Sequence, residues 1–386
     1  MEYITVKELF KITKGKKVEE IDYKNENSIR YIQIDDLRNN NNIKHCENIN
    51  KYVIAKKEDI IIAWDGANAG TIGFGIEGAI GSTLAILRKE NKEMDTEFCG
   101  LFLRSKSAYL REKCTGATIP HIQRTALEDI KIPKISLNKQ IEIKNIINKA
   151  QELIDKRKEQ IQDLDELVKS KFIEMFGNPF DTTKWTIKKL KEISTSISDG
   201  SNIDKKYYQK HGEVLFLRIQ NVWCNEFRLE DSVYISENVN QDYIDTSLRK
   251  GDLLITKIGR FYTKDSSLGR VSLYLGENDK ANYSNNIMRV RLKDEVLSEY
   301  INSLLNLDDY NQYIRRVSVG GTDKRALSKT LIGDFPIIVP PMELQKKFID
   351  FVNQVDKLKF EMEKSLKELE NNFNSLMQKA FKGELF

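Results

Sequence analysis

The sequence predicts an α+β protein in which two mixed α/β domains are separated by two long antiparallel coiled-coil helices, in a tandem pseudo-twofold repeat. Three observations predict this fold. The chain has 386 residues, more than one hydrophobic core usually serves. The second half of the chain repeats the first, and each half ends in a long stretch without Pro or Gly. The predicted segments are a first mixed domain, a central helix, a second mixed domain and a C-terminal helix, over residues 1–135, 136–180, 181–338 and 339–386.

The repeat is clearest in the two long helical stretches. Leu137-Asn138-Lys139-Gln140 aligns with Met342-Glu343-Leu344-Gln345, and the same register places Ile147 on Val352 and Phe176 on Phe381. The front halves match with small changes in loop length. Lys57-Glu58-Asp59 matches Lys250-Gly251-Asp252, and Thr115-Gly116-Ala117-Thr118 matches Val319-Gly320-Gly321-Thr322. Two copies of one module therefore follow each other in the chain.

Each mixed domain combines strands with short helices. Short β-branched runs such as Ile60-Ile61-Ile62-Ala63-Trp64 are bounded by Gly, Asn and Asp, which is typical of strands and turns. Between the strands, apolar spacing indicates helical segments, for example from Glu97 to Arg111 and from Val296 to Arg316.

The second part of each module is predicted to be one long helix. Apolar residues between 143 and 172 follow the three-four spacing of a buried stripe, and Gly177-Asn178-Pro179 provides the stop. The C-terminal copy begins at Met342, after Pro340-Pro341, and is expected to end near Phe381. About forty residues give a rod of roughly 60 Å. One narrow stripe does not stabilise an isolated helix, so we expect the two rods to pack on each other, with the mixed domains at opposite ends.

Composition excludes several classes of protein. No run of about 18 apolar residues is present, so we expect no membrane span. The start of the sequence has no signal-peptide pattern, which predicts a cytoplasmic protein. Four dispersed cysteines and three histidines do not form the close spacing that a metal site needs, so no metal is expected. A net charge of only +4 leaves nucleic-acid binding open.

The predicted geometry itself points to a function. Two related heads held apart by a stiff rod suit a protein that reads two DNA half-sites. Because the heads keep one frame but differ in detail, the two half-sites should differ in sequence.

At this point the motifs resemble those of a known family. The tandem module, Lys-x-Asp followed by three aliphatic residues, and the Gly-x-Thr or Gly-Gly-Thr loop are similar to those of type I restriction–modification specificity subunits. So are the Pro-Pro-Met-Glu-Leu-Gln helix start, the Met-Phe-Gly-Asn-Pro segment ending at Pro179, and the terminal Ala-Phe-Lys-Gly-Glu-Leu ending at Leu385. The resemblance covers essentially the whole chain. Ser136-Leu137, where the family often has Pro-Leu, and Lys139, which replaces an acidic residue, depart from the pattern only at the first helix start.

The resemblance implies a non-catalytic subunit with two target-recognition domains, each reading one half of a bipartite, asymmetric site on double-stranded DNA. It implies that the long helices set the spacer length and dock two methyltransferase (modification) subunits, and that restriction subunits join the complex. It further implies that this chain carries no cofactor and that the partners use S-adenosylmethionine, ATP and Mg. The C-terminal segment would tie back to the domain junction.

Two glycine-containing loops are the main candidates for DNA contact. Direct readout requires polar or basic side chains on loops that enter a groove, and glycine lets backbone approach phosphate. The first loop offers Gly116, Thr118, His121, Gln123 and Arg124, with Ala117 between them, and the second offers Gly320, Gly321, Thr322, Lys324 and Arg325. The alternative is an ordinary turn with solvated charges.

Further polar residues recur in both copies. Ser82-Thr83 and Asn285-Asn286 occupy the same place, and Gln33 and Gln220 approximately so. These side chains either read bases or satisfy backbone groups. Lys257, Arg260 and Lys264 flank Gly259 and either neutralise phosphates or lie exposed. Asp59 and Asp252 also recur, but each opens a strand from a turn, which favours a structural role over catalysis.

Residues on the two rods are candidates for partner binding. They are Gln140, Ile143, Ile147, Gln345, Phe348, Val352 and Phe381, and each faces either a partner or the opposite rod. Three other functions stay open: a methyltransferase or nuclease with a duplicated domain, a coiled-coil scaffold whose heads bind protein, and the recognition subunit of a related type II system. The enzyme would need a glycine-rich cofactor loop or a carboxylate cluster, and neither pattern is found in the sequence.

Overall fold

The fold is described from a computed structural model that covers residues 2–90, 93–116, 118–181, 184–263, 265–382 and 384–385. It divides into two compact units. The first unit comprises Met1–Lys158 and Lys364–Phe386, and the second comprises Glu159–Glu363. In the described parts of the chain, no helix combines the length and the apolar character that crossing a membrane requires.

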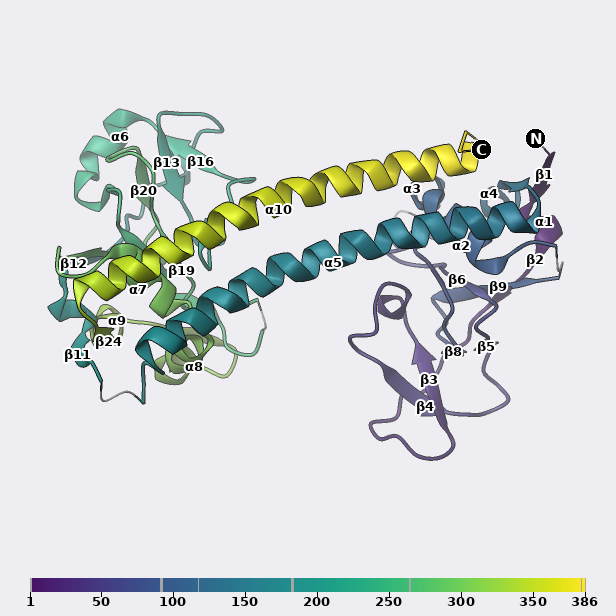
Figure 1. The fold of residues 1–386 in the computed structure, drawn as a ribbon, viewed down its shortest axis with the longest axis horizontal. Coiled ribbons are helices and arrows are strands. Elements are labelled where there is room, and N and C mark those ends of the chain that lie inside the picture. The colour runs from purple at the N-terminus through teal and green to yellow at the C-terminus, as the bar shows by residue number, and fades with distance from the viewer. Residues whose placement is uncertain are drawn as a thin grey trace. The chain divides into compact units, whose positions relative to one another are not determined.

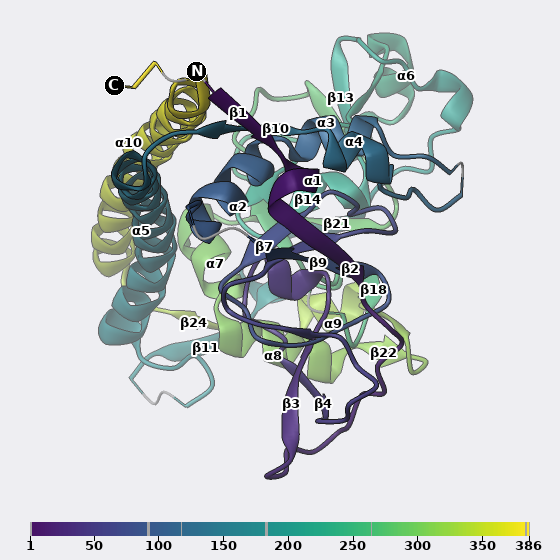
Figure 2. The ribbon, with the colours of Figure 1, turned by 90° about the vertical axis from the view of Figure 1, so that its right-hand side faces the viewer.

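The described residues of the first unit form three sheets. One pairs β1 with β10, which leads into the first long helix (Figure 2). The other two are four-stranded, in the orders β2-β9-β6-β7 and β4-β3-β8-β5. Their strands are β1 (Glu2–Thr5), β2 (Phe10–Lys14), β3 (Ser28–Ile32), β4 (Lys44–Glu47), β5 (Ile54–Ala55), β6 (Ile60–Ala63), β7 (Ile72–Phe74), β8 (Gly78–Ile80), β9 (Leu84–Lys89) and β10 (Lys131–Lys134).

The second unit repeats this arrangement and adds two small sheets. Strand β11 pairs with β24, and the larger sheets have the orders β12-β21-β17-β19 and β16-β13-β20. The additions are β14-β15 and β18-β23-β22. The strands are β11 (Thr186–Lys189), β12 (Ser194–Asp199), β13 (Val214–Leu217), β14 (Val222–Trp223), β15 (Glu226–Phe227), β16 (Val233–Ile235), β17 (Leu253–Thr256), β18 (Ile258–Arg260), β19 (Val271–Leu273), β20 (Ala281–Tyr283), β21 (Ile287–Leu292), β22 (Val319–Gly320), β23 (Lys324–Ala326) and β24 (Pro336–Val339).

The predicted tandem repeat is confirmed by strand pairing. In both units, the strand nearest the unit's start pairs antiparallel with the strand that precedes a long helix. The order β2-β9-β6-β7 corresponds to β12-β21-β17-β19, and in each unit the next sheet contains one parallel pair, β3 with β8 or β13 with β20. The α+β fold class is therefore as predicted, with the same frame in both halves.

The short helices differ from the prediction in one respect. The two predicted helical stretches each divide into two helices, α2 with α3 and α7 with α8. At the first break, the Ser105 hydroxyl donates to the Phe102 carbonyl at 2.6 Å, and at the second the Asn306 amide donates to the Asn302 carbonyl at 2.9 Å. Such side chains compete with the backbone for the carbonyls of the last turn. The short helices are α1 (Val6–Leu9), α2 (Thr96–Ser105), α3 (Ser107–Glu112), α4 (Arg124–Glu128), α6 (Glu237–Asp242), α7 (Ser298–Leu305), α8 (Asp308–Val317) and α9 (Lys329–Gly333), with 3₁₀ turns η1 (Asp35–Leu37), η2 (Leu190–Glu192), η3 (Lys205–Tyr207), η4 (Ile219–Asn221) and η5 (Ile244–Thr246).

Both long helices have the predicted bounds within one residue. Helix α5 spans Leu137–Phe176, and α10 spans Met342–Lys382. Gly177 follows α5 with a φ of 81°, and its N–H donates to the Ile173 carbonyl at 2.8 Å. This left-handed residue closes the last turn and ends the helix, as the Gly-Asn-Pro sequence predicts.

Within each unit the two helix segments lie side by side and run antiparallel (Figure 1). In the first unit, Lys158 of α5 forms an ion pair with Glu370 of α10 at 2.8 Å. In the second unit, Lys359 pairs with Asp165 at 2.7 Å, and the rings of Phe172 and Phe348 are 5.3 Å apart. Residues later in α5 pair with residues earlier in α10, so the two helices run antiparallel.

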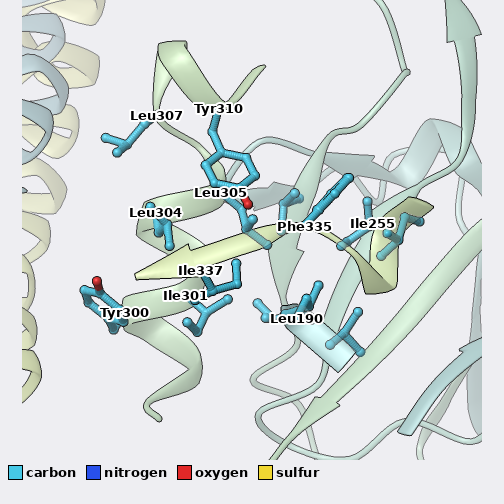
Figure 3. Packing of buried hydrophobic residues seen from close by; sticks show 14 of the residues in the cluster. Leu190, Ile255, Tyr300, Ile301, Leu304, Leu305, Leu307, Tyr310, Phe335 and Ile337 are labelled. Carbon is cyan, nitrogen blue, oxygen red and sulfur yellow. The ribbon is translucent and has the colours of Figure 1, made fainter. Parts of the chain in front are cut away.

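Each unit takes the beginning of one long helix and the end of the other into its core. In the second unit, Phe348 near the start of α10 and Phe172 and Phe176 near the end of α5 pack with Tyr300. This aromatic group belongs to the core drawn in Figure 3, where Tyr300 lies with Ile301, Leu304 and other residues of α7. In the first unit, Phe381 packs edge-on against Phe98 and Phe102. The end of α10 therefore packs into the core of the first unit.

A buried glutamine fastens each helix start to its own unit. The Gln140 side chain accepts from the Asp95 N–H at 2.7 Å and donates to the Ile135 carbonyl at 2.7 Å. The Gln345 side chain accepts from the Leu297 N–H and donates to Pro340, both at 2.9 Å. Both glutamines are fully buried, so unpaired amides would be costly there. Their repetition therefore has a structural cause.

The recurring aspartates Asp59 and Asp252 have the predicted structural role. Asp59 is buried and receives Arg88 through two hydrogen bonds of 2.9 and 2.5 Å. Asp252 is buried and receives Arg291 through two bonds of 2.7 Å each. Each carboxylate also accepts a backbone N–H of the turn that precedes its strand. These bidentate pairs fix the turn to the central strands β9 and β21.

We expect Asp252→Ala to lower the free energy of unfolding by about 2–4 kcal/mol, because it leaves the Arg291 guanidinium and a turn N–H without their acceptor. The measurement is urea unfolding of the full chain. Asp350→Ala, at an exposed position of α10, is the control and should change stability by less than about 0.5 kcal/mol. Equal effects of the two substitutions would contradict the structural role.

Candidate nucleic-acid interface

In the first unit, three candidate residues lie at one edge of the sheets. Ser82 and Thr83 are exposed in the turn between β8 and β9. The Trp64 N–H donates to the Thr83 carbonyl at 2.7 Å, which ties this turn to the end of β6. The Gly81 N–H donates to the Ile32 carbonyl at 3.2 Å, and Gln33 follows directly. Gln33, Ser82 and Thr83 are therefore brought together.

Residues 116–124, called here the first Gly-Thr loop, pack against the same turn. Thr115 and His121 exchange backbone hydrogen bonds of 2.9 and 2.7 Å, which fold the loop back on itself. Gly116 has a φ of 103°, and a Cβ there would lie 2.4 Å from the Ile119 carbonyl oxygen, so this position requires glycine. The Ile122 N–H donates to the Trp64 carbonyl at 2.9 Å. Ala117 lies outside the described residues.

The side chains of the first Gly-Thr loop are available to a ligand to different degrees. Thr118, His121, Gln123 and Arg124 are all exposed. Arg124 forms an ion pair with Glu128 one helical turn later, at 2.7 Å, so binding a phosphate would require it to exchange this partner. Trp64, whose carbonyl accepts the Ile122 N–H of this loop, is half-buried against the core of the first unit.

Asp65 contacts two basic side chains at this edge. Its carboxylate lies 2.7 Å from the Lys14 ammonium and 2.6 Å from Nδ1 of His121. Burial alone would raise the pKa of Asp65, but its hydrogen bonds with Lys14 and His121 lower the pKa below the ordinary value. Lys14, at the end of β2, was missed by sequence reasoning. The available signal was weak, because only its position at the end of the first strand of the repeated sheet distinguishes it from the chain's many other lysines.

The lowered pKa of Asp65 makes a prediction about acid stability. A carboxylate whose pKa is lower in the folded protein contributes stability above the unfolded pKa, about 3.9, and loses it as the pH falls through the folded value. Asp65→Asn should therefore destabilise the chain at pH 7 and pH 5 alike and differ less from the parent below about pH 3. The measurement is the urea concentration at the midpoint of unfolding at each of these pH values. Asp129→Asn, at an exposed position, is the control. A difference that instead grows toward low pH would contradict it.

The second unit builds the same edge from different side chains. The Lys257 N–H donates to the Asn286 carbonyl at 2.9 Å, and the Leu327 N–H donates to the Lys257 carbonyl at 2.8 Å. These bonds match those of Trp64 in the first unit. Asn285 is exposed and Asn286 half-buried. The Ser284 N–H donates to the Leu217 carbonyl at 2.9 Å, which brings Arg218 to the position that Gln33 holds in the first unit.

Residues 320–325, called here the second Gly-Thr loop, form part of a small sheet with β18. Arg260 lies opposite Lys324, and Gly259 lies opposite Arg325. Gly320 also pairs with Arg325, while Gly321 and Thr322 are exposed at the turn. The sheet therefore gathers four candidates, Arg260, Gly320, Lys324 and Arg325, next to Lys257. Lys264 lies outside the described residues.

Two aromatic residues accompany this basic sheet and were not among the sequence candidates. The Arg325 guanidinium lies 4.0 Å from the centre of the Phe261 ring, and the neighbouring Tyr262 is 76% exposed. A ring exposed beside arginine and lysine can stack on a base or a sugar. The composition of the sequence around Phe261-Tyr262 was the available signal, because two aromatic residues in a polar loop are unusual.

Each edge carries one lysine–aspartate pair, but the two pairs occupy partly different positions of the shared frame. Lys14 at the end of β2 pairs with Asp65 in the first unit, whereas Asp199 at the end of β12 pairs with Lys257 in the second. The charge at the end of this strand is thus reversed, while its partner Lys257 holds the place of Trp64, one residue before that of Asp65. A ligand would meet different electrostatic patterns at the two edges.

Gln33 and Gln220 do not hold equivalent positions. The N–H of Gln33 donates to Asp36 at 2.7 Å, and the corresponding bond in the second unit runs from the Arg218 N–H to Asn221 at 3.0 Å. The counterpart of Gln33 is therefore Arg218. Gln220 lies two residues further along, exposed, and its amide donates to Asp231 at 3.1 Å.

The residues suggested for partner binding belong instead to the chain's own cores. Six of the seven are buried and Val352 is half-buried, because the helix stripes are covered by their own units. The opposite rod is only part of what covers them, since Gln140 and Gln345 bond to the mixed domains and Phe381 packs on α2. They are Gln140, Ile143, Ile147, Gln345, Phe348, Val352 and Phe381. A partner would meet the exposed residues of the same helices, among them Leu153, Leu167, Leu358 and Phe360.

Comparison with known proteins gives a consistent result. The family model of the type I restriction modification DNA specificity domain matches residues 1–165 and residues 182–371, one match in each copy of the repeat. The type I restriction enzyme MjaVIII specificity subunit of Methanocaldococcus jannaschii is 24% identical over 400 residues, which cover 100% of this chain and 92% of the relative.

Solved structures share the fold. A chain from a study of complex assembly and conformational transition of the type I restriction–modification system matches with a TM-score of 0.60 and 16% identity, covering 100% of this chain and 98% of the other. The S subunit of a type I system from M. genitalium matches with a TM-score of 0.50 and 18% identity, covering 98% and 96%.

Proposed function

Because this chain belongs to the family of type I restriction–modification DNA specificity subunits, we propose that its two units each read one half of a bipartite, asymmetric DNA site. The subunit is non-catalytic. The first half-site is read by the edge that carries Ser82, Thr83 and the first Gly-Thr loop. The second half-site is read by the edge that carries Asn285, Asn286 and the second Gly-Thr loop.

One observation carries this proposal above the others. The two edges have the same backbone hydrogen bonds, from Trp64 and Ile122 in one unit and from Lys257 and Leu327 in the other, but different exposed side chains. A shared frame presents the loops to similarly shaped grooves, while the different side chains select different bases. A coiled-coil scaffold that bound proteins would not require polar, glycine-containing loops at the same place in both heads.

The remaining assignments follow from the family. We propose that α5 and α10 dock two methyltransferase subunits and set the spacer between half-sites, and that restriction subunits join the complex. S-adenosylmethionine, ATP and Mg act on those partners and not on this chain. A cytoplasmic location agrees with a role on cellular DNA. The recognition subunit of a related type II system would have the same reading edges and differ in its partners.

The test is a methylation map of genomic DNA from cells that carry the partner methyltransferase, with and without this chain. A split, asymmetric adenine-methylated motif should appear only when the chain is present. Exchanging residues 1–135 for those of another family member should change one half of the motif and leave the other half intact. An identical methylation pattern with and without a folded, expressed chain would overturn the proposal in favour of the scaffold.

A further inference from the structure

A basic pocket of about 530 Å³ lies in the first unit, between its α/β part and the first half of α5. Three arginines from separate segments line it: Arg38 after η1, Arg104 in α2 and Arg111 in α3. Helix α5, which lies beside α2 in Figures 1 and 2, contributes Gln151 and Asp155 from the other side. Three guanidinium groups therefore share one pocket with a single lining carboxylate.

Two of these arginines, Arg38 and Arg104, contact neutral groups of their own unit. Arg38 donates to the Asn68 side chain at 2.7 Å, and the Arg104 guanidinium lies 4.7 Å from the centre of the Phe74 ring. Within the described ranges, neither Arg104 nor Arg111 has a carboxylate at ion-pair distance. The Ser107 hydroxyl adds a hydrogen-bond donor to the lining, whereas the Thr71 hydroxyl donates to the Asn68 carbonyl at 2.8 Å. Three guanidinium groups with a hydroxyl donor beside them suit a phosphate, whose oxygens accept several hydrogen bonds at once.

In the second unit, an aromatic residue stands at the position that corresponds to Arg38. Arg38 stands two residues after Asp36, and Trp223 stands two residues after Asn221, the side chain that accepts the equivalent backbone N–H. The Trp223 ring lies 3.5 and 3.6 Å from two guanidinium groups, those of Arg228 and Arg270. In the second unit two arginine side chains therefore lie against the indole ring of Trp223. In the first unit three arginines line an open pocket.

We propose that the pocket formed by Arg38, Arg104 and Arg111 binds a phosphate group, and that a backbone phosphate of DNA beside the first half-site supplies it. Asn68, which holds Arg38, belongs to the loop whose Gly66 N–H donates to the Pro120 carbonyl of the first Gly-Thr loop at 2.8 Å. This loop therefore connects one side of the pocket to the first Gly-Thr loop of the proposed reading edge. This inference rests on the proposed function. It assigns to the first unit a contact that positions DNA without reading bases.

The experiment compares the double variant Arg104→Gln/Arg111→Gln with the control Lys131→Gln/Lys139→Gln, which removes equal charge at exposed positions outside the pocket lining. Binding of the full chain with its partner methyltransferase to cognate and non-cognate duplexes is measured over a range of salt concentrations. Ser107→Glu, which keeps all three arginines but adds a carboxylate to the pocket, is measured in parallel. Circular dichroism and urea unfolding identify any variant that fails to fold.

We expect the double variant to bind both duplexes roughly tenfold more weakly, with the slope of log K against log salt reduced in magnitude by about 1–2. Ser107→Glu should change affinity in the same direction. The methylated motif should stay the same, because the pocket positions DNA and reads no base. Affinities and slopes equal to those of the control for both pocket variants would overturn a DNA phosphate as the ligand.

Calorimetry with inorganic phosphate and with ATP separates the two sources of the phosphate. Saturable binding to the parent chain that is lost in both pocket variants, with unchanged DNA affinity, would retain the phosphate site but assign it to a free nucleotide or phosphate. If the pocket variants left DNA affinity unchanged and the parent chain bound neither inorganic phosphate nor ATP, a phosphate site would be excluded. The proposed function is judged separately, because its failure appears as the loss of any chain-dependent methylated motif in the parent protein.

Discussion

Replacing Phe348 with alanine should lower the free energy of unfolding by about 3–5 kcal/mol, the largest stability effect that we expect from a single substitution in this chain. Phe348 is fully buried, and its ring lies 5.3 Å from that of Phe172 and 5.6 Å from that of Phe176. Its removal leaves a cavity where the start of α10, the end of α5 and helix α7 meet. The surrounding rings belong to two other elements, α5 and α7, and cannot all move to fill it.

The control for this prediction lies on the same helix. Phe360 is 65% exposed, so Phe360→Ala removes a ring of the same size without opening a cavity and should change stability by less than about 0.5 kcal/mol. Urea unfolding of the full chain, followed by tryptophan fluorescence, measures both, since Trp185 packs 6.3 Å from the Phe176 ring. If both variants lost similar stability, the aromatic cluster would not be what fastens α10 to the second unit.

The second large effect concerns DNA affinity. We expect the triple variant Lys257→Gln/Arg260→Gln/Lys324→Gln to bind its DNA on the order of 100- to 1000-fold more weakly, because three cationic groups of one edge are removed together. The magnitude of the salt slope should fall by about 2–3. In a methylation map, the half of the motif read by the second unit should be lost or become degenerate.

A charge-matched control distinguishes this effect from a general loss of positive charge. Lys346, Lys347 and Lys357 are exposed on α10, and their replacement by glutamine removes the same three charges from the same unit. Binding by the isolated chain should change little in that control. Equal weakening by both triple variants would mean that net charge, and not the edge at the second Gly-Thr loop, governs affinity.

Some features were predictable because their causes are local in the chain. The end of α5 depends on Gly177, whose left-handed backbone closes the helix, and the start of α10 follows two prolines. The repeat was predictable because both copies keep the residues that their common frame requires. Asp59 and Asp252 are examples, since each accepts a hydrogen bond from the turn directly before it in sequence. The position of the Gly-Thr loops was predictable for the same reason.

The orientation of the helix stripes was not predictable in the same way. The spacing of the residues placed Gln140 on the apolar face of α5, and Phe348 and Phe381 on the apolar face of α10. An apolar face can contact a partner protein as well as the chain's own core. Burial decided between these possibilities, because each unit covers that face with residues more than 40 positions away. The breaks between α2 and α3 and between α7 and α8 were not predictable either. They depend on the backbone carbonyl to which the Ser105 or Asn306 side chain donates a hydrogen bond.

The amino-acid sequence by itself determined the tandem repeat, the bounds of both long helices, the glycine-containing loops and the resemblance that identifies the family. These depend on residues that are neighbours in the chain or one helical turn apart. Only the tertiary structure decided that Lys14 meets Asp65 and His121, that Arg218 replaces Gln33 at the second edge, and that three arginines surround one pocket. Each of these depends on contacts between residues far apart in sequence, whose positions are set by the packing of whole strands and helices and have no periodicity in the chain.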